Sequence, residues 1–336
     1  MKAVILKALG GTENFELAAY PQPQCKENEI LVAIKATAFN PIDYQMRRGD
    51  TESKLLKSPI LGRELAGEVE EVGSKVTRFR KGDRISAYVG SLGSNGTYAE
   101  YISFPSELAA IIPSGVDYAQ AAALPLVGMT ALQVADRITL DPSLPLFISG
   151  GAGGVGTILI QLLKAKGYDH IITTAGNAIS IEHLHRLGLA HDHILHYKTG
   201  NLAEEITRLL NGRPLEYAID LVGGSMAELC ASLLSVHGTY VNVTNLVPAN
   251  AMETLFDKAT TMFHVANYTY MLGPHPEGTA IYGKLLERLF RMIESQVISP
   301  APVNIVGPLS RETVQEAHRL LEGNLSQGKK LVMVNE

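Results

Sequence analysis

The chain has 336 residues with a net charge of −5 at pH 7, and 46% of the residues are hydrophobic. This length and composition are typical of a soluble protein with about two domains. The negative net charge excludes a chain-wide basic surface for nucleic acid, and no apolar run reaches the roughly 18 residues that span a bilayer.

The first residues, MKAVILKALGGTE, carry no signal-peptide cleavage pattern and are predicted to form a strand. The two cysteines, Cys25 and Cys230, lie far apart in the sequence, which favours neither a disulfide framework nor a cysteine-rich zinc knot. We therefore expect a cytoplasmic protein with neither a membrane nor a nucleic-acid partner.

Residues up to about 120 have the pattern of a β-rich domain. Turn residues around Gly73 and Gly82 separate short apolar or alternating runs. The predicted strands are Glu29–Ala38, Ala66–Val72, Asp83–Ala87 and Tyr98–Ser103.

From about Ala119 the pattern changes to strands that alternate with helices, which is typical of a parallel, doubly wound sheet. The predicted strands are Leu146–Ser149, Ile171–Thr174, Tyr217–Val222 and Thr239–Thr244. The predicted helices are one that follows Ser149, then Ile181–Leu187 and Tyr282–Val297. A closing strand at Leu331–Val334 indicates that the C-terminal part returns to the first domain.

Gly151, Gly153 and Gly156 follow a predicted strand and open a predicted helix, in the spacing G-x-G-x-x-G. In a dinucleotide site the first glycine permits the tight turn, the second lets the backbone approach a pyrophosphate, and the third lets the helix pack closely. The helix N-terminus supplies N–H groups for the phosphates. The alternative is a tight turn that binds no ligand.

The next strand ends at Thr174, near the expected position of the adenosine ribose, and no Asp or Glu follows it. An acidic residue there would repel a 2′-phosphate, so its absence favours NADP(H). Val222, Asn242 and Thr244 lie at or after other strand ends, where cofactor sites form in open α/β sheets. The alternatives are a solvated ribose and ordinary strand-end packing.

Six segments stand in this order along the chain: FNPIDYQMRRG (39–49), LGRELAGEVEEVG (61–73), LPLVGMTALQ (124–133), GGAGGVG (150–156), AIDLVGG (218–224) and GKKLVMV (328–334). Together they resemble the medium-chain dehydrogenase/reductase superfamily, and most of all its zinc-independent quinone oxidoreductase branch, which includes the zeta-crystallins. The resemblance extends almost from end to end of the chain.

The resemblance implies an α/β protein in which a GroES-like β-rich catalytic domain is split by a Rossmann cofactor domain, with the active site in the cleft. We expect the catalytic domain at 1–120 and 263–336 and the NADP-binding domain at 121–262. The implied reaction is hydride transfer from NADPH to quinones or α,β-unsaturated carbonyls, in a homo-oligomer that we expect to be a dimer. Loops around 88–96 and 263–273 are expected to shape the substrate pocket.

The zinc-dependent branch of the superfamily holds its metal with a cysteine and a His-Glu pair near these segments. Here the cysteine position resembles Asn40, and the histidine position is Arg63, followed by Glu64. An arginine stays protonated and an amide is a poor zinc ligand, so no metal is expected. Residues 89–101 contain no cysteine of a structural zinc lobe. The histidines between 183 and 196 are interpreted as a solvated helix and loop, with a metal site as the alternative.

Without zinc, hydrogen-bond donors must stabilise the charge that develops on the substrate oxygen. The candidates are the Asn40 amide and the Tyr44 phenol, in the segment that lines the cleft in the family; Tyr44 could instead be a core residue. Asp43 is interpreted as a cap of a helix that starts after Pro41. Arg63 and Glu64 could form a structural ion pair, and no dedicated general acid is evident.

The resemblance also implies contacts to the cofactor. Thr130 would contact the nicotinamide amide, Asn177 would lie near the 2′-phosphate, and Tyr197 near the adenosine. Where many NADPH-using relatives carry a lysine, this chain has Ser180, which brings no charge; Lys198 could supply one. The predicted cofactor-binding residues are Thr130, Gly151, Gly153, Gly154, Val155, Gly156, Thr174, Asn177, Ser180, Tyr197, Val222, Asn242 and Thr244.

Two other functions stay open. A zinc-type alcohol dehydrogenase with unusual ligands would hold stoichiometric zinc and lose it together with its activity. A structural or regulatory NADPH-binding protein would bind the cofactor without turnover.

Overall fold

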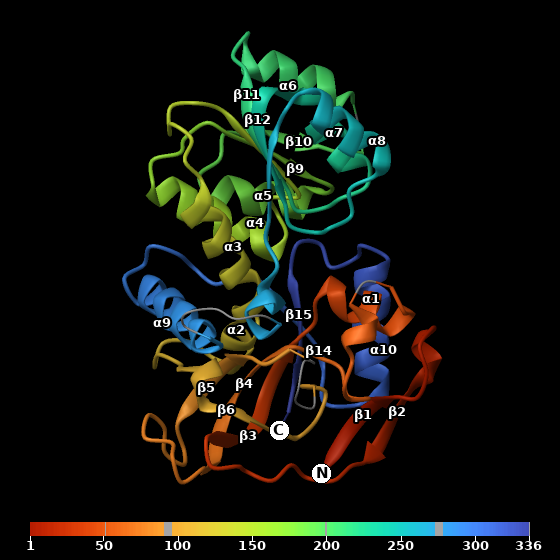
Figure 1. Cartoon of the computed structure of the whole chain (residues 1–336), viewed down its shortest axis with the longest axis vertical. Coiled ribbons are helices and arrows are strands. Elements are labelled where there is room, and N and C mark those ends of the chain that lie inside the picture. Colours follow the sequence, from red (N-terminus) through yellow and green to blue (C-terminus); the bar gives the residue numbers. More distant parts are fainter. Residues whose placement is uncertain (51, 91–95, 199, 273–277, 336) are drawn as a thin grey trace. The chain divides into compact units, whose positions relative to one another are not determined.

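The computed structural model describes residues 1–50, 52–90, 96–198, 200–272 and 278–335. It divides into two compact units (Figure 1). Unit 1 consists of Met1–Met129, Asn267–Gln296 and Pro300–Glu336, and unit 2 consists of Thr130–Ala266 and Val297–Ser299. The domain boundaries that we expect at 120/121 and 262/263 stay a proposal.

Unit 2 is built on a six-stranded sheet in which all registered neighbours are parallel. The strand order along the sheet is β10 (Ile194–His196), β9 (Ile171–Ala175), β8 (Leu146–Ser149), β11 (Leu215–Asp220), β12 (Leu234–Asn242) and β13 (Thr261–His264). In chain order this is 3-2-1-4-5-6, the order of a Rossmann domain, and the strand order reverses between β8 and β11.

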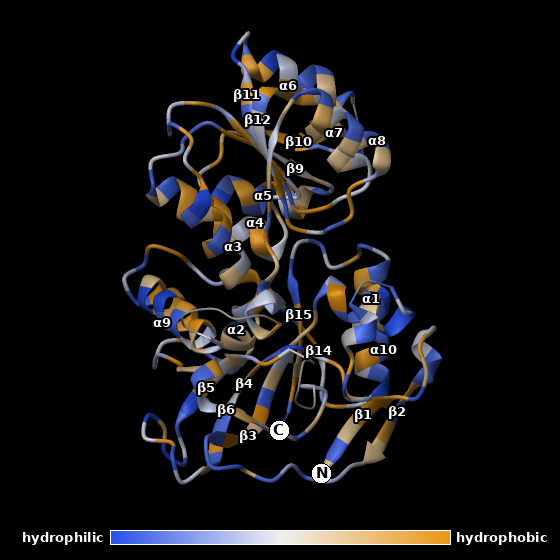
Figure 2. Ribbon diagram, in the orientation of Figure 1, coloured by the Kyte–Doolittle hydropathy of each residue, from blue (hydrophilic) through white to orange (hydrophobic). Residues whose placement is uncertain are grey.

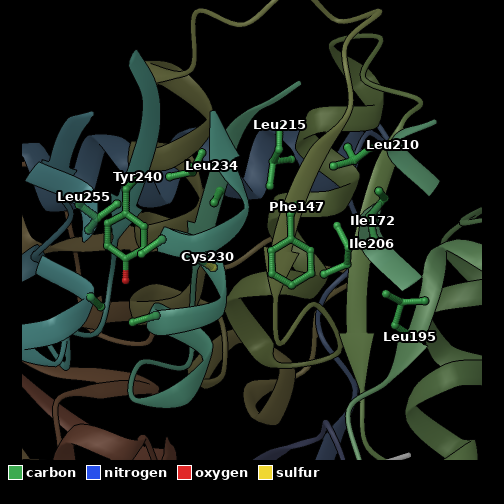
Figure 3. Packing of buried hydrophobic residues seen from close by; sticks show 14 residues of the cluster. Phe147, Ile172, Leu195, Ile206, Leu210, Leu215, Cys230, Leu234, Tyr240 and Leu255 are labelled. Carbon is green, nitrogen blue, oxygen red and sulfur yellow. The ribbon is translucent and has the colours of Figure 1, made fainter. Parts of the chain in front are cut away.

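Helices connect these strands, as a parallel sheet requires. They are α4 (Gly154–Ala165), α5 (Ala178–Arg186), α6 (Leu202–Leu210), α7 (Ser225–Leu233) and α8 (Ala249–Asp257). Helix α3 (Pro125–Arg137) begins in unit 1 and precedes β8. Residues of α6, α7 and α8 pack with strand residues in one buried cluster, in which Phe147 and Tyr240 are the large side chains of the sheet (Figure 3). The site at the strand ends therefore rests on a close-packed layer.

Unit 1 is β-rich. Its seven-stranded sheet has the order β14 (Val303–Gly307), β15 (Lys330–Val334), β3 (Glu29–Ala38), β4 (Glu64–Val72), β5 (Arg84–Tyr88) and β7 (Ala109–Ile111), with β6 (Tyr101–Pro105) also paired to β3. A separate hairpin joins β1 (Lys2–Leu6) and β2 (Phe15–Ala19). The helices of this unit are α1 (Pro41–Arg48), α2 (Tyr118–Ala122), α9 (Ala280–Glu294) and α10 (Arg311–Glu322).

The C-terminal segment returns to the N-terminal part of the chain, as the sequence indicates. Strand β15 pairs antiparallel with β3, with Val332 opposite Ala38. Hydrophobic and hydrophilic residues alternate around the turns of α9 and α10 (Figure 2). Val314 and Ala317 of α10 are buried with Phe15 of β2, so the apolar side of α10 closes this core.

The predicted fold class is confirmed, with differences at the element ends. The strand predicted at Tyr98–Ser103 is β6, Tyr101–Pro105. The strand predicted at Tyr217–Val222 ends at Asp220, because the Asp220 carboxylate accepts the N–H groups of Val222 and Gly223 and turns the chain. No helix of the described residues is long and apolar enough to cross a membrane.

Candidate functional site

The glycine turn of unit 2 joins β8 to α4 at the point where the strand order reverses. Gly150 has φ +70°, so the left-handed residue of this turn is Gly150 and not Gly151, to which we assigned the tight turn. Gly151 is needed for another reason: a Cβ there would lie 2.2 Å from Thr173 Oγ1. The backbone N–H groups of Gly150 and Gly151 donate to the hydroxyls of Thr174 and Thr173, which fixes the turn on β9.

Gly153 and Gly156 differ in what surrounds them. Gly153 is the exposed N-cap of α4, and a Cβ there would meet only the Gly150 carbonyl oxygen, at 3.3 Å. A Cβ on Gly156 would lie 2.4 Å from the Gly151 carbonyl oxygen, so Gly156 lets α4 pack against the turn. Gly154 and Val155 form the first turn of α4 and are partly buried. The turn therefore leaves its open side at Gly153, beside the N–H groups of a helix N-terminus.

Asp220, which our sequence analysis did not single out, organises the neighbouring strand end. Its buried carboxylate accepts the Ser149 hydroxyl at 2.7 Å and the Tyr240 phenol at 2.6 Å. It also accepts the Val222 N–H at 3.0 Å. Val222 is 47% exposed, and its Cγ2 would lie 2.7 Å from a Cβ on Gly150. Asp220 thus holds predicted residue Val222 against the glycine turn. The signal for it was an acid at the end of an apolar strand, in AIDLVGG.

The adenosine-side candidates gather after β9. The Asn177 side chain caps α5 by accepting the Ser180 N–H at 2.9 Å, and Ser180 is buried. A Cβ on Gly176 would lie 2.4 Å from the Tyr197 ring, so these residues are in close contact. Lys198 Nζ lies 5.8 Å from the centroid of the Tyr197 ring. Lys198 therefore places a positive charge beside Tyr197.

The other predicted cofactor residues lie at strand ends or on α3. Thr130 is buried on α3, and Thr174 is buried at the end of β9. The Asn242 side chain ends β12 and contacts His264 Nδ1 at 3.1 Å while accepting the Asn245 N–H. Thr244 accepts the Leu246 N–H, and its hydroxyl oxygen lies near Gly223. Of the predicted set, the structure brings the Gly150–Gly156 turn, Thr174 and Val222 into contact.

In unit 1, the candidate catalytic segment is the first turn of α1. Asn40 is the N-cap, Pro41 begins the helix, and Asp43 Oδ2 accepts the Asn40 backbone N–H at 2.8 Å. The predicted capping role of Asp43 is confirmed. Burial raises the pKa of the Asp43 carboxyl from 3.8 to about 6, although the Arg63 guanidinium and the Asn40 N–H act to lower it.

The Asn40 side chain belongs to a buried polar network. Its Nδ2 donates to Glu64 Oε1 at 2.7 Å, and its Oδ1 accepts from Lys330 Nζ at 2.5 Å. Lys330 Nζ also lies 3.0 Å from Glu64 Oε1, and Glu64 Oε2 accepts the Leu126 N–H at 2.7 Å. All four residues belong to unit 1. Lys330 stands within a recognisable motif, but nothing local in the sequence indicated its partners.

The ion pair that we expected between Arg63 and Glu64 is absent among the described residues; this prediction was wrong. Neighbouring residues of an extended segment point to opposite sides, and each charge finds its own partner. Arg63 Nη2 lies 2.5 Å from Glu52 Oε2, and its Nη1 donates to the Tyr88 hydroxyl at 3.3 Å. Glu64 pairs with Lys330 instead.

Tyr44 lies one helical turn after Asn40 on α1 and is partly buried. In the described part of the chain its hydroxyl has no hydrogen-bond partner, and neither has the second N–H of the Asn40 amide. The first turns of α1 therefore carry two uncommitted donors. The loop residues 91–95 and 273, which we expect to shape the substrate pocket, lie outside the described residues.

Comparisons with known proteins agree with this architecture. Residues 26–114 match the family described as alcohol dehydrogenase GroES-like domain, and residues 154–283 match the family described as zinc-binding dehydrogenase. A chloroplast envelope quinone oxidoreductase homologue of Arabidopsis thaliana is 33% identical over 261 residues, 75% of this chain and 77% of that protein. The chain belongs to the medium-chain dehydrogenase/reductase superfamily. Its predicted place beside the quinone oxidoreductases of that superfamily is confirmed.

Other superfamily members give the same picture. A dehydrogenase of Monascus ruber is 35% identical over 239 residues, but this alignment spans 65% of the chain and only 63% of that protein. An NADPH-dependent alkenal/one oxidoreductase of Arabidopsis thaliana is 28% identical over 99% of this chain and 79% of its own. The solved structure of Escherichia coli quinone oxidoreductase complexed with NADPH has a TM-score of 0.86 at 26% identity, covering 99% of this chain and 100% of that one.

Zinc is the metal that the superfamily suggests, so we asked whether the side chains of the described residues could bind it. No group of three or more His, Cys, Asp or Glu side chains in the described ranges could hold a metal ion. The histidines between 183 and 196 lie on α5, on a 3-10 turn and on β10. Asn40 and Glu64, which we matched to zinc-ligand positions from the sequence, already contact the ammonium group of Lys330. These residues do not fit a zinc site.

Proposed function

We propose that this chain is an NADPH-dependent, zinc-independent reductase of quinones or α,β-unsaturated carbonyls. The observation that carries the proposal is the pair of uncommitted donors on α1, the Asn40 amide N–H and the Tyr44 hydroxyl. The buried ammonium group of Lys330 lies beside Asn40. The quinone oxidoreductases and the alkenal/one oxidoreductase among the relatives support the substrate class.

The cofactor is NADP(H). The glycine turn with its open side at Gly153, the helix N-terminus of α4 and the exposed Val222 support pyrophosphate binding at this place. No acid follows β9, and Lys198 lies beside Tyr197, which supports a 2′-phosphate at this end. The related Escherichia coli enzyme was solved with NADPH. Bound nicotinamide supplies a hydride.

The residues of unit 1 act on the acceptor. When a quinone or an enone accepts a hydride, negative charge develops on its carbonyl oxygen. Asn40 and Tyr44 would donate hydrogen bonds to that oxygen, and such donors act most strongly where water is excluded. The proton that completes the reduction comes from water, because none of the described residues here is placed as a dedicated acid.

A paired titration with NADPH and NADH tests the cofactor. The chain has no tryptophan, so the fluorescence of the bound cofactor can be followed above the emission of the tyrosines. We expect tight binding of NADPH and weak binding of NADH. Equal binding of both would make the cofactor NAD(P)H, and binding of neither would refute the reductase proposal.

Turnover and metal content decide among the remaining functions. We expect oxidation of NADPH with quinones or enones by protein that has been treated with a chelator and contains no stoichiometric zinc. Activity that is lost with zinc and restored by it would make the chain a zinc-type alcohol dehydrogenase. NADPH binding without turnover over a broad panel of electrophiles would make it a structural or regulatory protein.

We also propose that the chain forms a homodimer in the cytoplasm. Strand β13 is an edge of the unit 2 sheet and could pair with a second copy. Sedimentation equilibrium would test the dimer.

A further inference from the structure

Lys330 is a buried lysine whose ammonium group takes no part in the transfer of the hydride or the proton. Its side chain is 6% exposed, and that of Glu64 is fully buried. The ammonium group has three oxygen acceptors: Asn40 Oδ1 at 2.5 Å, Glu64 Oε1 at 3.0 Å and the Phe39 carbonyl oxygen at 3.3 Å. All three hydrogens of the ammonium group are therefore satisfied without water.

The pairing of β15 with β3 places Lys330 there. The two strands run antiparallel, with Val332 opposite Ala38. Each step forward along β3 is a step back along β15, so continuing this register by two residues brings Lys330 opposite Asn40. The Phe39 N–H donates to the Leu331 carbonyl oxygen at 2.9 Å, which extends the pairing to the residue before α1.

These contacts fix the orientation of the Asn40 amide. A lysine ammonium can only donate, and a carboxylate can only accept. With Lys330 on one side and Glu64 on the other, the amide oxygen must face Lys330 and the amide nitrogen must face Glu64. The hydrogen bond to Glu64 uses one N–H, so the second N–H of Asn40 is held in one direction.

The ammonium group also supplies a fixed positive charge. It lies against Asn40 and Glu64, which occupy zinc-ligand positions of the superfamily and do not fit zinc. A buried carboxylate needs a paired cation, and Lys330 provides one that is covalently attached to the chain. The cation at this point is thus part of the protein and cannot be removed by a chelator.

We propose that Lys330 is a positioning residue that takes the place of a metal ion, holding the Asn40 amide so that its free N–H faces the acceptor oxygen. The part about the acceptor rests on the proposed reductase function. The part about the orientation of Asn40 stands without it.

The first test follows the Asn40 side chain directly. Protein labelled with 15N-asparagine gives side-chain amide signals, and that of Asn40 is the one missing in Asn40→Asp. We expect Lys330→Met to shift this signal and to speed its hydrogen exchange at least 10-fold. Lys329→Met is the matched control, since it removes an exposed ammonium from the preceding residue and should leave the signal unchanged.

The second test uses turnover. We expect Lys330→Met to lower kcat at least 10-fold while the KM for NADPH stays within a factor of two, and Lys329→Met to do neither. Propylammonium contains the part that Lys330→Ala removes, so adding it should restore part of the kcat of that variant. Tetramethylammonium, which cannot donate a hydrogen bond, should not.

The outcomes separate the two proposals. If Lys330→Met keeps the Asn40 signal and its exchange rate, the positioning role is refuted, whatever the activity. If wild-type protein reduces no acceptor, the reductase proposal fails, and the signal still decides the positioning role. If Lys330→Met does not fold, the double variant Lys330→Met/Glu64→Gln removes the unpaired carboxylate charge as well. An Asn40 signal that is the same in this double variant as in Glu64→Gln alone would also refute the positioning role.

Discussion

At the scale of single residues, removing the Tyr44 hydroxyl tests whether Tyr44 is a catalytic donor or a packing residue. Tyr44→Phe removes the oxygen and keeps the ring, so the fold should be unaffected. We expect kcat with a quinone to fall roughly 100-fold, the usual effect of losing one donor to a developing oxyanion, with the NADPH affinity unchanged. Steady-state kinetics with both substrates varied would measure this.

Tyr101→Phe is the matched control for this prediction, because it removes the hydroxyl of another partly buried tyrosine of unit 1, on β6. It should keep the wild-type kcat. If Tyr44→Phe also keeps it, Tyr44 is a core residue, the alternative that its sequence context left open.

The residues of the site were predictable to different extents. Asp43 was identified as a cap because a helix start has a local pattern, an acid three residues after an N-cap. Lys330 and Glu64 are 266 positions apart, so their contact depends on the register of β15 on β3 and has no local signature. The same holds for Arg63, whose partner Glu52 lies in a separate turn rather than at the next residue.

At the scale of elements, the glycine turn permits a test in which ligand binding and stability are changed separately. Gly153→Ala adds a methyl group that meets only the Gly150 carbonyl oxygen, at 3.3 Å, on the open side of the turn. We expect its stability to stay within about 0.5 kcal/mol of wild type, as for surface substitutions. We expect NADPH binding to weaken at least 10-fold, because the backbone can no longer approach a pyrophosphate.

Two further variants frame this prediction. Gly156→Ala would place a Cβ 2.4 Å from the Gly151 carbonyl oxygen, so it should lower the thermal midpoint of the protein itself. Gly115→Ala has nothing within 4 Å and should change neither property. Wild-type NADPH affinity in Gly153→Ala would contradict the assignment of the turn.

The capping residue of helix α1, Asp43, can be tested by measuring the free energy of unfolding at different pH values. The folded state holds the Asp43 proton up to about pH 6, whereas the ordinary pKa is 3.8. Between these values the folded state binds a proton that the unfolded state has released, so the free energy of unfolding falls as the pH rises. Relative to Asp43→Asn, wild type should lose about 1 kcal/mol between pH 5 and pH 7.5 in urea unfolding. If the difference in the free energy of unfolding between the two proteins stayed constant with pH, the pKa of Asp43 would not be raised in the folded state.

Several short apolar strands were predicted well, whereas several helices, α6 and α10 among them, were not predicted. Strands β3 and β8 begin and end where the sequence indicates. Helix α10 has two polar residues, Thr313 and His318, on its buried side beside Val314 and Ala317. Strand β11 was predicted too long, because side-chain capture of backbone N–H groups by Asp220 overrides the apolar run that continues to Val222.

At the scale of the whole molecule, the return of the C-terminal segment ties together distant parts of unit 1. Our sequence analysis predicted this return from a closing strand, since GKKLVMV has a strand pattern. The contacts that α10 makes with the N-terminal part of the chain were not predicted. His318 of α10 is buried against Phe15, 4.9 Å between ring centroids, and its Nε2 lies 3.2 Å from the Tyr98 hydroxyl.

Because His318 is buried, we expect it to make the folded protein less stable in acid. Burial, with a smaller contribution from the Arg47 guanidinium, lowers the pKa of His318 from 6.5 to about 3. Between these values the unfolded state binds a proton that the folded state does not, so the free energy of unfolding falls as the pH falls, opposite in sign to Asp43. Relative to His318→Gln, wild type should lose about 2 kcal/mol from pH 7.5 to pH 5 in urea unfolding. The packing cost of the substitution is the same at both pH values and cancels from this difference. Wild type and His191→Gln, a change at an exposed histidine, should lose the same free energy of unfolding over this pH range. If wild type and His318→Gln also lost the same amount, His318 would be protonated in the folded protein.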